Sequence, residues 1–372
     1  MHQTSSPATQ EAGKPLRIVL VGAGHAHLYT LKRAGELTGR GHEVVLVNPS
    51  RYLDYSGMAT GVLSGRYRPE EARIDAAALV ERGDGEFVGG TVASISPADK
   101  TLRLASGASL GYDLVSFATG SSTSLLDALK PADGDLFPVK PVGNLFRLRG
   151  RLLGASGFRG SRILVVGGGA AGCEVAANLA ALYAFRGAKA GLIKLSERAQ
   201  RLLPSAPGKA SRLMRRHLEN AGVEVILGAR AADAGPGAGT VVAATGVRAP
   251  ELFAASGLAV GAGGGLLVDE HLCSVGDVNV FGGGDSVSVG QRGLPGFGVY
   301  AIRQGPVLFS NLAATADGGA LRRFRPQKRN LYVMNLGDGT GLGVYGGFVW
   351  KGRSARLVKD YVDLRFIRDY RV

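Results

Sequence analysis

Two glycine-rich turns, far apart in a chain of 372 residues, have the residue types and spacing that point most directly to chemistry. The first reads GAGHAH at 22–27 after an apolar run, and the second reads GGGAAG at 167–172 after another apolar run. Glycine has no Cβ, so such turns let backbone N–H groups and the start of a helix approach a pyrophosphate closely. One such turn is a weak signal, but two predict that the chain binds two dinucleotides.

The elements that must position these turns repeat one pattern: a buried strand, a tight turn and a helix of small residues. We expect parallel strands at Leu16–Val21 and Glu43–Val47, on either side of a helix near His27–Leu37. A segment rich in Pro and Gly, 131–143, is typical of a linker. Further strands are predicted at Thr91–Ile95, Thr101–Leu104, Leu114–Phe117, Ala190–Leu195, Val223–Leu227, Thr240–Ala244 and Val278–Phe281. The predicted fold class is α/β, with two Rossmann-like dinucleotide-binding domains.

Composition narrows the class of protein. Hydrophobic residues make up 45% of the chain, and no apolar run reaches the roughly 18 residues of a membrane span. The net charge of +14 favours anionic partners. No motif with interleaved aromatic residues accompanies that charge, so we expect no nucleic acid as partner. Cys173 and Cys273 are the only cysteines, which indicates a reducing, cytoplasmic compartment.

Seven motifs occur in the order found in a known superfamily. They are GAGHAH at 22–27, YSGM at 55–58, FATG at 117–120, GGGAAGCE at 167–174, AATG at 243–246, GGGD at 282–285 and VYAIRQGP at 299–306. Together they resemble the pyridine nucleotide–disulfide oxidoreductases. Within that group the chain resembles type II NADH dehydrogenases, and it resembles still more closely the FAD module found N-terminal to some selenide, water dikinases. The resemblance covers nearly the whole chain and implies non-covalent FAD, with NADH or NADPH as substrate.

The resemblance also implies which residues bind FAD. The third glycine of the usual turn is His27 here, so the helix and strand must pack differently at that point. Asn48 ends the second strand, where the family has an acidic residue, and an amide still forms neutral hydrogen bonds to a ribose. Asp285 either binds the ribityl or pyrophosphate region or caps the next helix. The implied FAD-binding residues are Gly22, Ala23, Gly24, His25, Asn48, Val92, Thr119, Gly120, Gly284 and Asp285, and those implied beside the flavin are Tyr55, Ser56 and Met58.

The second turn is implied to bind NADH or NADPH. If Glu197 lies at the end of the second strand, it favours NADH by accepting a hydrogen bond from the ribose 2′-OH; if Arg198 or Lys194 points inward, a 2′-phosphate fits better. The stretch 228–240 is short where the family has a strand pair, which predicts a trimmed second domain. The implied residues are Gly167, Gly169, Gly172, Glu197 and Gly246.

Two residues are implied to take part in the reaction. Glu174 matches a family glutamate near the flavin and is a candidate proton carrier, because burial raises the pKa of a carboxyl. Alternatively, it is a first-turn carboxylate stabilised by the helix dipole. Gln304 matches a position near the isoalloxazine and a quinone. Disulfide reductases of this fold have a cysteine pair near 52–58, and this chain has none there, so we expect no disulfide exchange. His25 and His27 lie two residues apart with no matching cluster of cysteines or carboxylates, so we expect no metal site.

The C-terminal segment predicts a helix with one broad apolar face. That face carries Leu357, Val358, Tyr361, Val362 and Leu364. A basic amphipathic helix with an aromatic anchor lies on anionic bilayers, where quinones reside; the same face could instead pack on the body or form a homodimer. The predicted localisation is therefore cytoplasmic, either free or peripheral on the inner face of the membrane.

The predicted function is an FAD-dependent NAD(P)H dehydrogenase that passes electrons to a quinone-like acceptor. Two alternatives stay open: an FAD-dependent oxidoreductase of a sulfur or selenium substrate, and an FAD-binding redox-sensing or partner protein with little turnover. We expect a disordered tail at 1–14, an FAD-binding domain in two parts at 15–140 and 247–326, an inserted NAD(P)H-binding domain at 141–246, and a C-terminal membrane, dimer or packing segment at 327–372.

Overall fold

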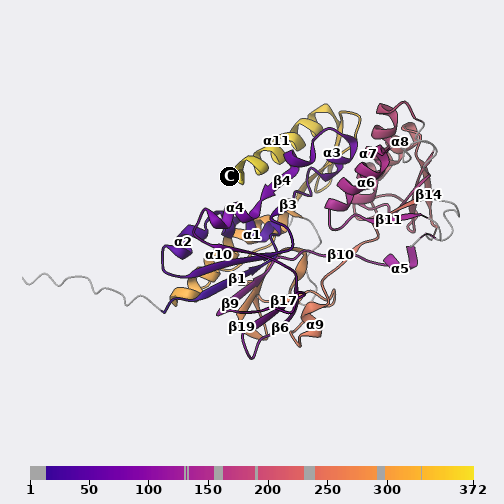
Figure 1. The fold of residues 1–372 in the computed structure, drawn as a ribbon. Helices are drawn as coiled ribbons and strands as arrows, with labels where there is room; N and C mark the ends of the chain where they lie inside the picture. The colour runs from indigo at the N-terminus through magenta and orange to yellow at the C-terminus, as the bar shows by residue number, and fades with distance from the viewer. Residues whose placement is uncertain are drawn as a thin grey trace, which may run out of the picture. The chain divides into compact units, whose positions relative to one another are not determined.

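The chain forms two compact units in a computed structural model (Figure 1). Unit 1 comprises the described parts of Met1–Arg51, Ala76–Gly120 and Ala249–Arg325; unit 2 comprises those of Tyr52–Asp75, Ser121–Arg248 and Pro326–Val372. The structure describes residues 14–129, 131, 134–154, 162–188, 192–229, 239–290, 298–327 and 329–372. The predicted tail, apart from Lys14, and most of the predicted trimmed stretch 228–240 lie outside these residues.

The centre of unit 1 is an eight-stranded sheet in the order β20-β17-β18-β19-β9-β1-β2-β5. Strand β1 (Arg17–Val21) pairs in parallel with β2 (Glu43–Asn48), as predicted, and it also pairs in parallel with β9 (Leu114–Phe117). Its continuous apolar run suits a strand covered on both faces, and Ile18, Val19 and Leu20 are fully buried. The other strands are β5 (Glu86–Gly89), β17 (Leu266–Val268), β18 (Cys273–Ser274), β19 (Asp277–Gly282) and β20 (Val287–Val289).

Helix α1 (His25–Lys32) leaves the first turn and packs against α10 (Gly298–Asp317), which lies beside it in Figure 1. The predicted helix near His27–Leu37 is therefore two helices, α1 and α2 (Ala34–Thr38). A separate antiparallel sheet consists of β6 (Val92–Ser96), β7 (Thr101–Leu104) and β8 (Ser109–Gly111). The remaining helices of unit 1 are α4 (Ala76–Glu81), α9 (Leu252–Ala255) and the 3-10 helix η4 (Gly284–Ser286).

Unit 2 has its own parallel sheet, in the order β11-β15-β12-β13-β14. The sheet is surrounded by apolar side chains, and Val165, Leu195 and Val242 are fully buried. The prediction of a linker over 131–143 is wrong in part, because β11 lies within it and pairs with β15. The five strands are β11 (Asp135–Pro138), β15 (Thr240–Ala243), β12 (Ile163–Val166), β13 (Ile193–Glu197) and β14 (Glu224–Leu227).

Helices cover this second sheet, and the chain ends in an added layer. The helices are α6 (Gly143–Leu153), α7 (Ala170–Phe185), α8 (Gly208–Asn220) and the shorter α3 (Ala59–Ser64), which packs on α6 and α7. An antiparallel meander then leads into α11, the helix that packs on it. The strands of the meander are β21 (Leu331–Asn335), β22 (Gly341–Tyr345) and β23 (Phe348–Gly352), and the helix is α11 (Arg353–Asp369).

Short pairs of strands complete unit 2. They are β3 (Tyr52–Asp54) with β4 (Arg73–Asp75), and β10 (Ser122–Thr123) with β16 (Val247–Arg248). The α/β fold with Rossmann-like parallel sheets is confirmed. No helix of the described residues combines the length and the apolar character needed to cross a bilayer.

Candidate functional site

The first glycine turn lies at the carboxyl end of β1, where α1 begins. Gly22 has a φ of +85°, and a Cβ there would meet the Ala118 carbonyl oxygen at 2.7 Å. The N–H of Gly24 donates to the same oxygen at 3.0 Å, and a Cβ on Gly24 would collide with it. Because a helix leaves its first N–H groups without partners inside the helix, this narrow turn can bind a phosphate.

Asn48 reaches this turn from the end of β2. Its Oδ1 accepts a hydrogen bond from the N–H of Ala23 at 3.0 Å, and its Nδ2 donates to the Ser50 carbonyl at 2.6 Å. The amide therefore orients the turn from the position where the family has an acidic residue. Its hydrogen bonds to the protein are neutral, as expected for this side chain.

Three further motifs converge on the first turn and α1 within unit 1. A Cβ on Gly22 would lie 2.8 Å from the Cα of Thr119, and one on Gly283 would lie 2.7 Å from the Ala26 side chain. Gln304 is 1% exposed, and its Oε1 accepts from the N–H of Gly284 at 2.7 Å. Unit 1 thus brings the FATG, GGGD and VYAIRQGP motifs to the first turn. Of the other residues implied to bind FAD, Gly120 and Gly284 have positive φ, Asp285 lies inside η4, and His25 begins α1. Val92 does not lie in the large sheet; it begins β6 in the separate sheet.

The second glycine turn repeats this geometry at the carboxyl end of β12. Gly167 has a φ of +105°, and a Cβ there would collide with the Ala244 carbonyl oxygen. A Cβ on Gly172 would collide with the Gly167 carbonyl oxygen, so α7 approaches the strand as closely as glycine permits. Gly169 is the N-cap of α7, and a Cβ there would point into open space. Gly246, with a φ of +78°, follows β15 in the same unit. A phosphate group fits such a cradle.

Glu197 is the last residue of β13 and binds the second turn. Its carboxylate accepts from the N–H of Gly168 at 2.5 Å and from the N–H of Ala199 at 2.7 Å. Lys194 forms an ion pair with Glu224 at 3.1 Å. The carboxylate therefore lies at the turn, while the neighbouring lysine is held by another acidic residue.

Glu174 lies on α7 in a polar cluster of unit 2 that the sequence did not reveal. One carboxylate oxygen accepts from the Thr60 hydroxyl at 2.9 Å and from the N–H of Asn335 at 2.8 Å. Burial raises the pKa of Glu174, and the positive charge of Lys359 and these two hydrogen bonds partly oppose that rise. Asp363, which accepts from the Tyr55 hydroxyl at 3.0 Å, raises it further. Burial therefore favours the protonated form of this carboxyl more than it is favoured in an exposed glutamate.

The segment Tyr55–Met58 precedes α3 in unit 2. Tyr55 and Met58 are buried, whereas Ser56 is exposed. Lys359 and Asp363 contact this segment from α11, and the only sequence signal for them was their spacing of one helical turn opposite the apolar face.

Neither cysteine is placed for redox chemistry. Cys173 and Cys273 are both buried and unbonded to each other. Burial raises the pKa of Cys173, and it raises the pKa of Cys273 to about 12, so both stay as thiols at neutral pH. Among the described residues there is no group of three or more His, Cys, Asp or Glu that could hold a metal ion.

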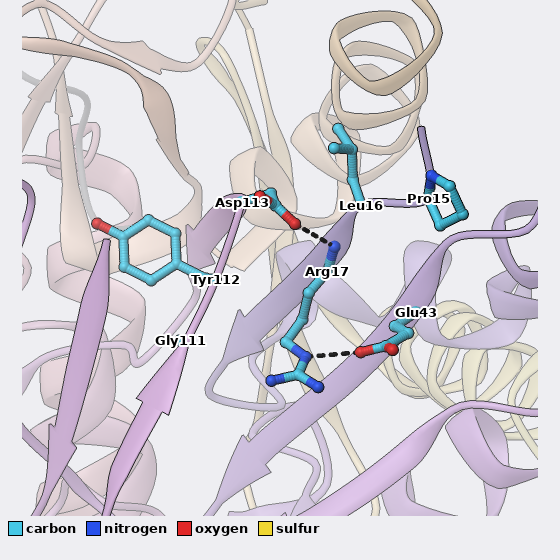
Figure 2. A pocket seen from close by; sticks show the side chains of 7 residues that line it. All are labelled: Pro15, Leu16, Arg17, Glu43, Gly111, Tyr112 and Asp113. Atoms are coloured by element: carbon cyan, nitrogen blue, oxygen red, sulfur yellow. Dashed lines mark hydrogen bonds and ion pairs between the residues drawn. The ribbon is translucent and has the colours of Figure 1, made fainter. Parts of the chain in front are cut away.

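Unit 1 has a cavity of about 290 Å³, and Figure 2 shows the side chains that line it. Arg17 crosses it, with its backbone N–H bonded to Asp113 at 2.8 Å and its guanidinium paired with Glu43 at 2.6 Å. These residues lie at the amino ends of β1 and β2. The cavity is thus at the opposite edge of the sheet from the glycine turn, and parallel sheets bind their ligands at the carboxyl edge.

Known proteins share both the sequence pattern and the fold. Residues 16–305 match the family described as pyridine nucleotide-disulphide oxidoreductase. The chain is 28% identical over 295 residues to probable ferredoxin reductase CtmF of Castellaniella defragrans, which covers 72% of this chain and 67% of that protein.

Many solved structures have a similar fold, and two of them serve as examples. NDH2 of Plasmodium falciparum in complex with NADH has a TM-score of 0.80 at 14% identity, covering 95% of this chain and 96% of that one. The sulfide:quinone oxidoreductase of Aquifex aeolicus has a TM-score of 0.76 at 15% identity, covering 96% of this chain and 92% of that one. Identities this low show a common fold, and the substrate has to be argued from the site.

Proposed function

We propose a function from one premise: this chain belongs to the pyridine nucleotide-disulphide oxidoreductase family. It is accordingly an FAD-dependent oxidoreductase with NAD(P)H as substrate. We infer that it transfers two electrons from NAD(P)H, through non-covalently bound FAD, to a quinone. When bound, FAD supplies the chemistry of hydride acceptance and electron donation. The protein binds and orients FAD and the nicotinamide nucleotide, and it supplies protons.

The observation that carries this proposal is the pair of glycine turns, each at the carboxyl end of its own parallel sheet. In unit 1, Gly22 and Gly24 press against the Ala118 carbonyl; in unit 2, Gly167 presses against the Ala244 carbonyl. Each turn opens a helix whose first N–H groups favour a phosphate. We assign the first turn to FAD and the second to the nicotinamide nucleotide, as the family order implies.

The second turn favours NADH over NADPH. The Glu197 carboxylate lies at the end of β13, bonded to the N–H of Gly168. A carboxylate at this point accepts hydrogen bonds from the ribose 2′-OH and repels a 2′-phosphate. Of the two cations that could have balanced a phosphate, Lys194 is already paired with Glu224, and Arg198 is exposed. We therefore propose NADH as the preferred reductant.

The acceptor is proposed from the chemistry of Glu174. A quinone takes up protons as well as electrons, so a group that holds a proton at working pH is required. Glu174 has a raised pKa and is oriented by Thr60 and Asn335. The two cysteines are single and buried, so electrons have no disulfide to pass through. Direct transfer of electrons from the flavin to a quinone accounts for the raised pKa of Glu174 and for the single, buried cysteines.

Helix α11 supports a peripheral contact with a membrane. Its exposed face carries Leu357, Tyr361 and Leu364, which are 68%, 64% and 45% exposed. The alternative that this apolar face packs on the body is wrong for Leu357, Tyr361, Val362 and Leu364, which are exposed. Helix α11 instead buries Ala355, Arg356, Asp363 and Ile367. That inner face includes the ion pairs Arg356–Asp360 at 2.7 Å and Lys359–Asp363 at 2.8 Å.

Basic residues share the exposed face of α11. Arg353, Arg365 and Arg368 are exposed on the same helix. Apolar side chains with an aromatic anchor and arginines beside them suit the headgroup region of an anionic bilayer. We propose this surface as the contact with the membrane that holds the quinone, and a second copy of the chain is the rival occupant.

The acceptor is tested by reducing the flavin with NADH without oxygen and then mixing it with a water-soluble quinone or with a [2Fe–2S] ferredoxin. We expect the quinone to reoxidise the flavin and Glu174→Gln to slow that step at least tenfold, because an amide does not act as an acid or a base near neutral pH. Flavin reduction by NADH stays near the wild-type rate. Reoxidation by the ferredoxin alone would instead assign this chain the acceptor named for its Castellaniella relative.

A further inference from the structure

Leu125 combines a strained backbone with an exposed side chain. Its φ is +61°, in the left-handed region that disfavours residues with a bulky side chain, and the residue is 67% exposed. Two other leucines among the described residues have positive φ, Leu203 and Leu272, and they are 3% and 0% exposed. Burial of those two side chains in the core offsets their strain. Leu125 gains no such burial, so packing within the protein does not explain why a leucine is kept there.

Two reciprocal hydrogen bonds hold the residue before Leu125 against the AATG motif of unit 2. The Ser124 hydroxyl donates to the Thr245 carbonyl at 2.5 Å, and the Thr245 hydroxyl donates to the Ser124 carbonyl at 2.6 Å. Directly after Leu125 the chain enters the short helix α5 (Leu126–Leu129), which contacts β15. Leu125 is therefore fixed on both sides, near the carboxyl end of β15.

This position adjoins the second glycine turn. A Cβ on Gly167 would lie 3.4 Å from the backbone nitrogen of Thr245, the residue that bonds Ser124. Strands β13 and β15 lie on opposite sides of β12, and all three are parallel, so their carboxyl ends share one edge. The proposed function has the pyrophosphate at the turn after β12 and the adenosine ribose at Glu197, which ends β13. The nicotinamide half of the dinucleotide then extends the other way, over the end of β15.

We propose that Leu125 is a binding residue for the nicotinamide ring of NADH. This inference rests on the proposed function, which assigns the second turn to NADH. The reduced nicotinamide ring is uncharged and flat, and such a group binds through contact with apolar side chains. Val247 adds a second apolar side chain: it pairs with Thr123, on the strand that leads to Leu125, and is 46% exposed. Contact with the ring removes the Leu125 side chain from water, which offsets the strain of its backbone.

The test compares two ligands of the FAD-loaded protein by isothermal titration calorimetry. Tetrahydro-NADH carries an uncharged ring that donates no hydride, so binding is measured without reduction of the flavin. ADP-ribose has the same adenosine and pyrophosphate but lacks the ring. We expect Leu125→Ala to raise the Kd of tetrahydro-NADH about tenfold, because the apolar contact with the ring is lost. The Kd of ADP-ribose is expected to change by less than about twofold, since that ligand does not reach Leu125.

A second variant, Leu125→Gly, guards against loss of the fold, because glycine adopts positive φ without steric cost. We expect the same selective loss of tetrahydro-NADH binding from it. The matched control is Phe185→Ala, which changes an 83% exposed residue at the far end of α7 and leaves both Kd values unchanged. Equal weakening of both ligands by the two Leu125 variants, or no weakening of either, would overturn the proposal. A wild-type protein that does not bind ADP-ribose would instead contradict the assignment of the second turn, so the two failures are told apart.

Discussion

Among single residues, His27 replaces the third glycine of the first turn and is completely buried. Its Nδ1 lies 2.6 Å from the Gly22 carbonyl oxygen and its Nε2 lies 2.8 Å from the Ser116 hydroxyl. A carbonyl only accepts hydrogen bonds, so Nδ1 carries the proton and Nε2 accepts from the hydroxyl. The imidazole therefore fastens the turn to the neighbouring strand, a task that the usual glycine performs by close packing.

This geometry predicts how stability depends on pH. Burial lowers the pKa of His27 to about 4, against an ordinary value of 6.5. Between these values the unfolded chain binds a proton that the folded chain does not, so His27 contributes stability above pH 6.5 that is lost as pH falls toward 4. We expect the free energy of unfolding to fall by about 2–3 kcal/mol between pH 7 and pH 4.5 from this residue.

Urea unfolding at the two pH values measures that dependence. The control is His27→Asn, which is less stable at pH 7 and loses this part of the pH dependence, since it cannot titrate. The same pH dependence in the variant as in the wild type would assign the acid lability to other groups.

Among the elements, the start of α7 depends on glycine for its approach to β12. Gly172→Ala places a methyl group against the Gly167 carbonyl oxygen. We expect this change to lower the free energy of unfolding by about 2–3 kcal/mol and to weaken NADH binding at least tenfold, because overpacking displaces the turn. Denaturant unfolding and an NADH titration measure the two effects. Gly150→Ala in α6, where a Cβ meets open space, is the matched control and is expected to stabilise slightly.

Helix α11 predicts binding to anionic vesicles. We expect the protein to bind vesicles that contain phosphatidylglycerol, and Leu357→Gln/Leu364→Gln to reduce that binding at least tenfold, since about 2–3 kcal/mol of burial is lost for each leucine. Cosedimentation measures the bound fraction. The control, Val278→Gln, changes an apolar residue that is 73% exposed on β19 of unit 1. Unchanged vesicle binding in the double variant, with a loss of dimer on a sizing column, would assign the face to a second copy of the chain.

For the chain as a whole, local sequence was enough to predict both glycine turns and the strands that lead into them. Gly22 and Gly167 have positive φ at strand ends, a requirement that a short stretch of sequence expresses by itself. Strand β11 could not be predicted from local sequence, because it is formed by pairing with β15, which comes much later in the chain.

The Glu174 cluster was hidden for a similar reason. Its members Thr60, Asn335 and Lys359 come from three distant segments. The sequence left open which face of α11 packs on the rest of unit 2. The helix buries ion pairs and exposes leucines, whereas an amphipathic helix usually buries its apolar face. Long-range pairing of charged side chains leaves no periodic signal in one sequence.

The most direct test of the whole account is anaerobic stopped-flow mixing of the FAD-loaded protein with NADH or NADPH while flavin absorbance is recorded. We predict rapid bleaching by NADH and slower bleaching by NADPH, because the Glu197 carboxylate lies at the second turn. A flavin that stays oxidised with both nucleotides, or a protein that does not retain FAD, would contradict the assignment of the two glycine turns.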